Sequence, residues 1–433
     1  MDILLICTDL YKDLAGGGQF VTRKIIENLP EYNFYYFIDK ESITNVHRPK
    51  NTKVFKLGEI IDVIVETPNL CKEELNSIKI ANKFARSVKN LHFDFVEFPD
   101  YTIFGNHLRH ALLHHNIKFR CIILSLHGNI SKSMELNWDS EYNTNIVKLE
   151  KDQFIEADIT YGISKRYINE NIASLNKNVF YLNPIFLLNR FYDPTSYNQF
   201  NNLNTSIFFI GRLEKRKGPD LFIDIVSKLN KNLYKSINMI GDDCFTNNGD
   251  SARDIIIDLA KKNDLEINFS KPLSQDELNT IYTNNSILIL PVRYDTFNLV
   301  ALDAIFAGCP IAISKDAGIC DFLDNEYPTI PYIRINDINN AAIEIEKVLL
   351  NYNEYKSKLT SALNSIVINM DFKKQLSDIY NLNKSEVKYY NKKSNFIYKE
   401  KAFSIKYKLQ HILHNVLSKK MYNKIIFLLK KVQ

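Results

Sequence analysis

Two acids and two bases, near and beyond the middle of the chain, have side chains that can bind hydroxyl groups and phosphates. Asp295 and Asp303 lie in RYDTFNLVALDAIFAGCPIAIS, with seven residues between them. Carboxylates accept hydrogen bonds from vicinal hydroxyls, so one acid can bind a ribose and the other a sugar. Arg212 and Lys217 lie in GRLEKRKG. Arg binds phosphate in a fork and Lys acts as a mobile charge, so this pair suits the diphosphate between the two sugars.

Each of these residues also has an ordinary structural interpretation. Asp295 can cap a helix and Asp303 can be a polar residue on a helix face. The run from Gly211 to Gly218 can be a solvated basic turn. The binding interpretation therefore depends on whether the surrounding elements bring the residues together.

The flanking sequence predicts that they do meet. The run SILILPV (286–292) is apolar and of strand length, and AGCP (307–310) ends a helix before a second strand, IAIS. GRLEKRKG directly follows another strand-like run, SIFFI. In parallel sheets ligands bind at the carboxyl ends of the strands, where helix N-termini favour anions. Both loops are expected at that edge.

Strand-like runs alternate with helical patterns along most of the chain, which is typical of doubly wound parallel sheets. The predicted strands of the first half are ILLIC (3–7), 35–38, 54–57, 95–98, 121–126 and 159–163. Those of the second half are SIFFIGR, INMIG, INF, SILILPV and PIAIS. The polar stretch YNQFNNLNTS lies between the halves and is predicted to be a linker. At 433 residues the chain has room for two such domains.

Charge and cysteine content narrow the function classes. Residues 384–433 contain thirteen Lys and two Glu, a balance of +11, so the rest of the chain carries −6. A mildly acidic body argues against a nucleic-acid enzyme. The six cysteines form no CxxC pair, which favours reduced thiols, a cytoplasmic location and no metal site. No apolar run is long enough to cross a bilayer, and the N-terminus lacks the pattern of a secretory signal.

Taken together, these segments resemble the retaining glycosyltransferases of family 4, which have the GT-B fold. GRLEKRKG and PVRYDTFNLVALDAIFAGCPIA match the donor-site pattern of that family at its spacing. Supporting pieces are the GGG loop (16–18), VEFPDY, SLHG, ADITYGISK, LNPI and a terminal FKKQLSDIYNL. The resemblance covers roughly residues 1–383.

The resemblance implies a fold class of two Rossmann-like α/β domains that face a cleft, followed by a basic helical tail. The expected boundaries are 1–196 for the acceptor-side domain, 197–206 for the linker, 207–365 for the donor domain, 366–383 for a helix that crosses back, and 384–433 for the tail.

The resemblance also implies site roles. Arg212 and Lys217 are expected on the donor diphosphate, Asp295 near the donor sugar and Asp303 on the ribose. His127, after the strand CIILSL, is expected to face the reacting carbon, although a strand-end histidine bound to backbone is the alternative. The full predicted donor-binding set is Gly17, Gly18, Arg212, Lys217, Asp295, Phe297, Asn298, Leu299, Val300 and Asp303, with His127, Arg212, Lys217 and Asp295 catalytic. A plain turn is the alternative for the glycines.

The implied reaction is retaining transfer of a hexosyl or N-acetylhexosaminyl group from a UDP- or GDP-sugar to a glycan or lipid-linked acceptor, without a metal or other cofactor. Fixed cations stabilise the charge that develops on the leaving diphosphate. The chain departs from the family pattern because both acids are Asp rather than Glu. Val292 also stands where Ser is common, and Asn298 where Gly is common.

Two other functions and one further partner are consistent with the sequence. A non-catalytic nucleotide-sugar binding protein would keep the fold without turnover, and a nucleotide-sugar epimerase would act without an acceptor. In the tail, apolar residues recur at helical spacing among lysines, as in Leu409, Ile412, Leu413, Val416 and Leu417. This pattern favours a peripheral helix on an anionic membrane surface. A helix packed on the body and a solubilising extension are the alternatives.

Overall fold

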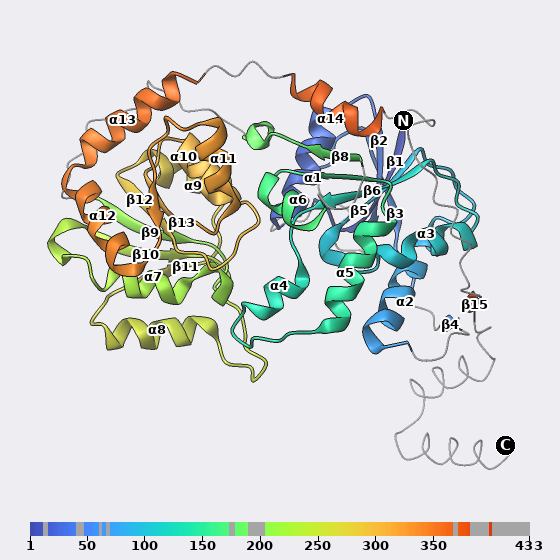
Figure 1. Ribbon diagram of the computed structural model, residues 1–433, viewed down its shortest axis with the longest axis horizontal. Helices are drawn as coiled ribbons and strands as arrows, with labels where there is room; N and C mark the ends of the chain where they lie inside the picture. The colour runs from blue at the N-terminus through green and yellow to red at the C-terminus, as the bar shows by residue number, and fades with distance from the viewer. Residues whose placement is uncertain are drawn as a thin grey trace, which may run out of the picture.

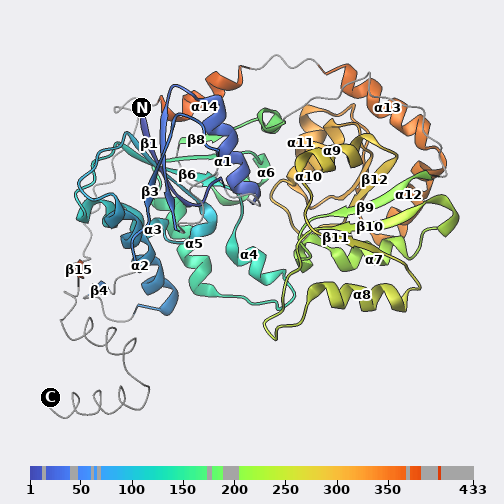
Figure 2. The ribbon, with the colours of Figure 1, turned by 180° about the vertical axis from the view of Figure 1, so that it is seen from behind.

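Two parallel sheets, each covered by helices on both faces, make up the body of the molecule (Figures 1 and 2). The computed structural model describes residues 1–11, 16–39, 47–59, 63–65, 70–172, 178–188, 204–366, 371–381 and 398–400. The predicted fold class of two doubly wound α/β domains is confirmed.

The first sheet has seven strands in the order β3-β2-β1-β5-β6-β7-β8, and every neighbouring pair is parallel. Its strands are β1 (Asp2–Thr8), β2 (Asn33–Ile38), β3 (Thr52–Lys56), β5 (Phe95–Pro99), β6 (Cys121–Leu126), β7 (Ile159–Gly162) and β8 (Asn178–Tyr181). β8 was not predicted. Every residue of β5, β6 and β7 is buried, because helices cover both faces of the sheet.

The helices of this domain divide between the two faces according to the alternation of the strands. Their bounds are α1 (Gly17–Asn28), α2 (Lys72–Ser87), α3 (Gly105–His114), α4 (Ile130–Glu135), α5 (Thr144–Glu156) and α6 (Lys165–Asn171), with short 3-10 turns at Asp100–Thr102 and Pro184–Leu187. α1 packs with Ile3 and Leu5 on one face. α2 and α3 pack with Leu4 and Ile6 on the other, since successive strand residues point to opposite faces.

The second sheet has six parallel strands in the order β11-β10-β9-β12-β13-β14. They are β9 (Ser206–Ile210), β10 (Ser236–Ile240), β11 (Asn268–Ser270), β12 (Ser286–Leu290), β13 (Ile311–Ser314) and β14 (Ile333–Ile335), of which β14 was not predicted. The helices are α7 (Pro219–Val226), α8 (Ala252–Lys262), α9 (Gln275–Thr283), α10 (Leu299–Phe306), α11 (Gly318–Glu326), α12 (Ile338–Leu350) and α13 (Tyr352–Asn364), with 3-10 turns at Lys215–Lys217 and Lys231–Leu233.

The strand order places the two candidate loops side by side. β9 and β12 are parallel neighbours. The chain continues from β9 to β10 on one side of the pair and from β12 to β13 on the other, which makes this the topological switch point. GRLEKRKG begins directly after β9, and the loop with Asp295 begins directly after β12. The sheet therefore opens a crevice where the sequence predicts the donor site.

The chain returns to the first domain after α13. Helix α14 (Phe372–Tyr380) lies beside α1 (Figure 1). The Tyr380 hydroxyl donates to Glu97 at 2.7 Å, and Tyr161 also donates to this carboxylate. Burial raises the pKa of Glu97 despite these two donors. A buried acid in the first sheet thus anchors the last helix of the body.

Most of the predicted linker and tail falls outside the described residues. This includes the apolar tail positions from Leu409 to Leu417 and residues 197–203 of the predicted linker 197–206. Within the predicted helical tail, residues Tyr398–Glu400 instead form a strand, β15, which pairs antiparallel with β4 (Val63–Val65). Among the described helices, none combines the length and the apolar content needed to cross a bilayer.

Candidate active site

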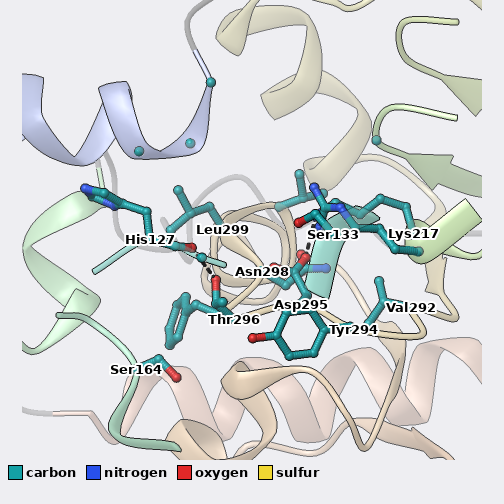
Figure 3. Close-up of a pocket in the computed structure, with 18 of the residues that line it drawn as sticks. His127, Ser133, Ser164, Lys217, Val292, Tyr294, Asp295, Thr296, Asn298 and Leu299 are labelled. Carbon is teal, nitrogen blue, oxygen red and sulfur yellow. Dashed lines mark hydrogen bonds and ion pairs between the residues drawn. The ribbon is translucent and has the colours of Figure 1, made fainter. Parts of the chain in front are cut away.

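A cavity of about 590 Å³ lies between the two domains. The first domain contributes the start of α1 and the loop after β6, and the second contributes the loops after β9 and β12 and the start of α10. Figure 3 shows His127 on one side of it and Lys217 on the other, with Asp295, Asn298 and Leu299 between them. Of the predicted site residues, all but Asp303 line this cavity.

The loop from Gly211 to Gly218 presents Arg212, Arg216 and Lys217 to the cavity. Gly218 has φ of 75°, and a Cβ there would lie 2.0 Å from the carbonyl oxygen of Pro291, so only glycine fits. Arg212 is more than half exposed and pairs with Glu214 at 2.6 Å. An exposed guanidinium at the cavity wall can turn from the buried Glu214 carboxylate to a phosphate in the cavity.

Lys217 and Asp295 are in direct contact. Lys217 Nζ lies 2.5 Å from Asp295 Oδ2. Burial lowers the pKa of Lys217, although the negative charge of Asp295 acts to raise it. Burial alone would raise the pKa of Asp295, but the charges of Lys217 and Arg216 outweigh it, so the pKa of this carboxyl lies below its ordinary value. Lys217, which is predicted to bind the diphosphate, and Asp295, which is predicted to lie near the sugar, thus form an ion pair in the free protein.

Asp295 does not cap α10. The N-cap is Asn298, whose side chain accepts a hydrogen bond from the backbone N–H of Ala301 at 2.9 Å. Asn298 has φ of 82°, a left-handed conformation that glycine adopts freely and asparagine tolerates better than most residues. This explains why Asn can replace the Gly that is common here. The capping alternative for Asp295 is therefore wrong.

The start of α10 points at the cavity. Leu299 and Val300, the first two residues of the helix, line it, and Phe297 precedes them. The backbone N–H groups of a first helical turn lack partners within the helix and favour an anion. The structure therefore places a helix N-terminus and a basic loop on the same cavity.

Asp303 lies one turn further along α10, outside the lining of the cavity. Burial raises its pKa to about 7, and the charge of Lys24 on α1 partly opposes this. Its position on the helix is compatible with a ligand that extends past the cavity toward α1, but the structure alone gives it no contact with the cavity. Its predicted role on a ribose stays a prediction.

His127 enters the site from the first domain with a ring nitrogen available. Its Nε2 is buried and has no hydrogen-bond partner among the described residues. Burial lowers the pKa of His127 to about 4, so the ring is neutral at neutral pH. Among the described residues, no backbone group forms a hydrogen bond with the His127 ring, which contradicts the alternative of a ring bound to backbone. Figure 3 shows the ring beneath α1, the helix drawn in pale blue.

The glycines at the start of α1 allow this close approach. A Cβ on Gly18 would lie 3.0 Å from the ring of Tyr101 and 3.1 Å from that of His127. A Cβ on Gly17 would lie 3.3 Å from Leu299 of the other domain. Both glycines line the cavity, so a side chain at either position would crowd it.

Asp100 fixes the His127 loop, a role that the sequence interpretation missed. Its carboxylate accepts from the backbone N–H groups of His127 at 2.9 Å and Gly128 at 3.1 Å, and from the Tyr167 hydroxyl at 2.6 Å. Burial raises the pKa of Asp100 to about 7. Thr296 of the other domain donates to the His127 carbonyl oxygen at 2.7 Å. The acid in VEFPDY, directly after a buried strand, was the available signal.

Arg216 also escaped the sequence interpretation. It lines the cavity between Arg212 and Lys217 and is held by Glu214 at 2.7 Å. The run KRK contains three basic residues, and the family pattern indicated only the last of them, Lys217, as a phosphate-binding residue. The cavity wall therefore carries three basic side chains.

Comparisons with known proteins agree with this geometry. Residues 197–362 match the family model "Glycosyl transferases group 1". A relative from Klebsiella pneumoniae, an uncharacterized 41.2 kDa protein in the cps region, is 25% identical over 128 residues, 30% of this chain and 32% of that protein. The matched region spans between 27% and 35% of the curated relatives' own lengths.

Solved structures cover much more of the chain. Sucrose-phosphate synthase from Thermosynechococcus elongatus superposes with a TM-score of 0.64 at 16% identity, over 88% of this chain and 95% of that one. Anabaena HepE, solved in complex with UDP and glucose, gives 0.60 at 12% identity, over 88% and 98%. Residues 197–362 are thus a group 1 glycosyltransferase domain, in a chain that has the GT-B fold.

Proposed function

We propose that the protein transfers a sugar from a nucleotide-sugar donor to a hydroxyl of an acceptor. The observation that carries this proposal is the cavity between the domains. Three basic side chains and the start of α10 lie on its second-domain wall, and the half-buried, neutral His127 lies on its first-domain wall. Cations at one wall suit a diphosphate, while an uncharged ring opposite suits a sugar.

The donor diphosphate binds the exposed Arg212 and Lys217, assisted by the N–H groups at the start of α10. To do so it must compete with Asp295 for Lys217. A released Asp295 is then free to accept hydrogen bonds from the sugar hydroxyls. Asp303 is assigned to the ribose, on the strength of its place one turn along α10. The HepE complex with UDP and glucose supports a UDP-sugar as the first donor to test.

In the reaction the bond between the anomeric carbon and the diphosphate oxygen breaks, and negative charge develops on that oxygen. Fixed cations aimed at this charge stabilise the transition state. The acceptor hydroxyl attacks from the leaving-group face and gives its proton to the departing phosphate, which retains the anomeric configuration. Such a route uses no covalent enzyme intermediate, unlike a retaining glycosidase.

The acceptor is proposed to be a glycan or a lipid-linked sugar in the assembly of a surface polysaccharide or glycoconjugate. The relative from Klebsiella, which is described as lying in the cps region, supports a role of this kind. A cytoplasmic enzyme with its basic tail on the anionic inner face of the membrane would meet a lipid-linked acceptor there.

The test uses the purified full chain with a panel of UDP- and GDP-sugars. Released nucleoside diphosphate is measured with and without glycan and lipid-linked acceptors, and binding of UDP and GDP is measured by calorimetry. Release that requires an acceptor supports the proposal, and release without an acceptor indicates a hydrolase. Conversion of the donor into another nucleotide sugar, with no release of nucleoside diphosphate, indicates an epimerase. Binding without turnover indicates a non-catalytic binding protein, and a chain that binds neither nucleotide would refute the proposal.

A further inference from the structure

The connection between α4 and α5 crosses from the first domain to the second. It runs between Glu135 and Thr144, the bounds of those helices. In Figures 1 and 2 this connection reaches the yellow-green loop before α8, at the edge of the molecule opposite α13 and α14. Three consecutive residues make the contacts, and we refer to Asn137, Trp138 and Asp139 as the strap.

Each residue of the strap binds a backbone group of the second domain. Trp138 Nε1 donates to the carbonyl oxygen of Leu213 at 2.7 Å. Asn137 Oδ1 accepts from the N–H of Lys215 at 3.0 Å. The Asp139 carboxylate accepts from the N–H of Asn247. Three successive side chains that all bind across a domain boundary indicate an interface with a defined register.

The Trp138 ring adds an apolar contact. It packs against the buried apolar cluster of the second domain, and Lys215 Nζ lies 5.8 Å from the ring centroid. An indole with its N–H bonded and its ring packed is immobilised at both ends. The contacts that fix Trp138 therefore all come from the second domain.

The strap binds the basic loop Gly211–Gly218 itself. Leu213 and Lys215 lie within Gly211–Gly218, on either side of Glu214, which pairs with both Arg212 and Arg216. The loop's other backbone contacts come from its own domain, such as Leu213 N–H to the Asp242 carbonyl oxygen at 3.0 Å. Two polar groups of the loop thus find their partners in the opposite domain.

We propose that the strap is a positioning element for the donor diphosphate. By fixing the backbone on either side of Glu214, the strap holds Arg212, which pairs with that carboxylate, at the cavity. Residues of the acceptor-side domain thereby set the affinity for the nucleotide. This inference rests on the proposed function. It adds that closing the domains completes the phosphate site, and it assigns Asn137 and Trp138 as the residues responsible.

The test measures the dissociation constant for UDP and for GDP by calorimetry on the full chain. Asn137→Ala removes one acceptor and Trp138→Phe removes one donor while it keeps an aromatic ring. Each neutral hydrogen bond contributes on the order of threefold to tenfold in an equilibrium constant, so each variant should bind the nucleotide about that much more weakly. Glu141→Gln is the matched control, since this exposed side chain of the same connection has no side-chain hydrogen bond or ion pair among the described residues.

A double-mutant cycle separates positioning from general loosening of the fold. If the strap acts by positioning Arg212, Asn137→Ala should weaken binding by less than about twofold in an Arg212→Ala background, because the side chain being positioned is gone. Thermal unfolding of each variant verifies that the fold is intact. Wild-type affinity in folded Asn137→Ala, or an undiminished effect in the Arg212→Ala background, would overturn the inference.

The two proposals fail in distinguishable ways. A wild-type chain that binds neither UDP nor GDP would refute the proposed function together with this inference. A wild-type chain that binds and turns over a nucleotide sugar, with strap variants of equal affinity, would refute the inference alone.

Discussion

Replacing Asp295 with Asn should separate the affinity for the nucleotide from turnover. In the free protein Asp295 holds Lys217 at 2.5 Å, and a diphosphate must compete for that ammonium. Asn has nearly the same shape as Asp but carries no charge. The variant therefore frees Lys217 for phosphate and also removes a negative charge from the neighbourhood of an anionic ligand.

The expected magnitudes follow from burial and charge. Removing one partner of a fully buried ion pair costs about 3–5 kcal/mol. Because 22% of the Lys217 side chain is exposed and the Asn carbonyl still accepts a hydrogen bond, we expect a loss of about 1–2 kcal/mol in the free energy of unfolding. The gain in affinity for the free nucleoside diphosphate should be about tenfold, or roughly 1.4 kcal/mol.

Turnover should change in the opposite direction. If Asp295 accepts hydrogen bonds from the sugar as it reacts, Asp295→Asn should lower the turnover number by on the order of a hundredfold with the intact donor. Calorimetry with the nucleoside diphosphate, denaturant unfolding, and the release assay give the three quantities. Asp316→Asn, at an exposed acid in the same domain, is the control for loss of one negative charge.

The pH dependence provides a second test of the same pair. The pKa of Asp295 is lowered in the folded protein, so its contribution to stability is present above its unfolded pKa and is lost as the pH falls through the folded value. The stability difference between wild type and Asp295→Asn should therefore shrink in acid. A folded Asp295→Asn protein that binds the nucleoside diphosphate more weakly than wild type would refute the view that the two compete for Lys217.

Four other outcomes are expected. Arg212→Ala should lower turnover by on the order of a hundredfold or more, because it removes a cation from the leaving diphosphate, and near-wild-type rates in a folded variant would contradict the donor site. Asp303→Asn should weaken binding of the nucleoside diphosphate yet stabilise the free protein. Burial raises the pKa of Asp303 to about 7, so the carboxylate lowers the stability of the wild type increasingly as the pH rises from about 4 to about 7. Unfolding at pH 5 and pH 8 measures whether the stability advantage of Asp303→Asn over wild type grows with pH. Turnover should persist in EDTA, and a loss that added Mg²⁺ restores would show that protein cations alone do not carry the charge. Full-length protein should sediment with anionic but not neutral vesicles at low salt, whereas a chain truncated after Asn383 should not; equal sedimentation of the two chains would remove the membrane role of the tail.

Much of the secondary structure could be predicted from local sequence. SIFFI, SILIL and CIILSL became β9, β12 and β6, because a parallel strand covered on both faces needs an unbroken apolar run. The strands that escaped prediction are short or polar. β8 (NVFY) has four residues, and β14 (IRI) has three with a charged residue at its centre. Such segments become strands only because a neighbouring strand offers its hydrogen-bonding edge.

The residue types at the site could also be predicted from the sequence, since strand-end loops with Arg, Lys and Asp are recognisable in one dimension. Their contacts could not. The sequence places Lys217 and Asp295 in separate loops, and only the adjacency of β9 and β12 brings the two charges to 2.5 Å. Likewise, Asp295 and Asn298 are both suitable helix caps by type, and the left-handed backbone at Asn298 decided which of them caps α10.

The resemblance to a known family implied two domains that face a cleft, but the contacts between the domains could not be predicted from the sequence. Asn137 and Trp138 show no motif, and nothing in their neighbourhood predicts that they bind a loop more than seventy residues away. Asp303 stands at the position of an acid in the family pattern, yet it lies outside the lining of the cavity. Helices and strands follow from interactions a few residues apart. The ion pair follows from the strand order of the second sheet, and the cavity and the strap follow from how two finished domains pack. Both depend on contacts that no local pattern records.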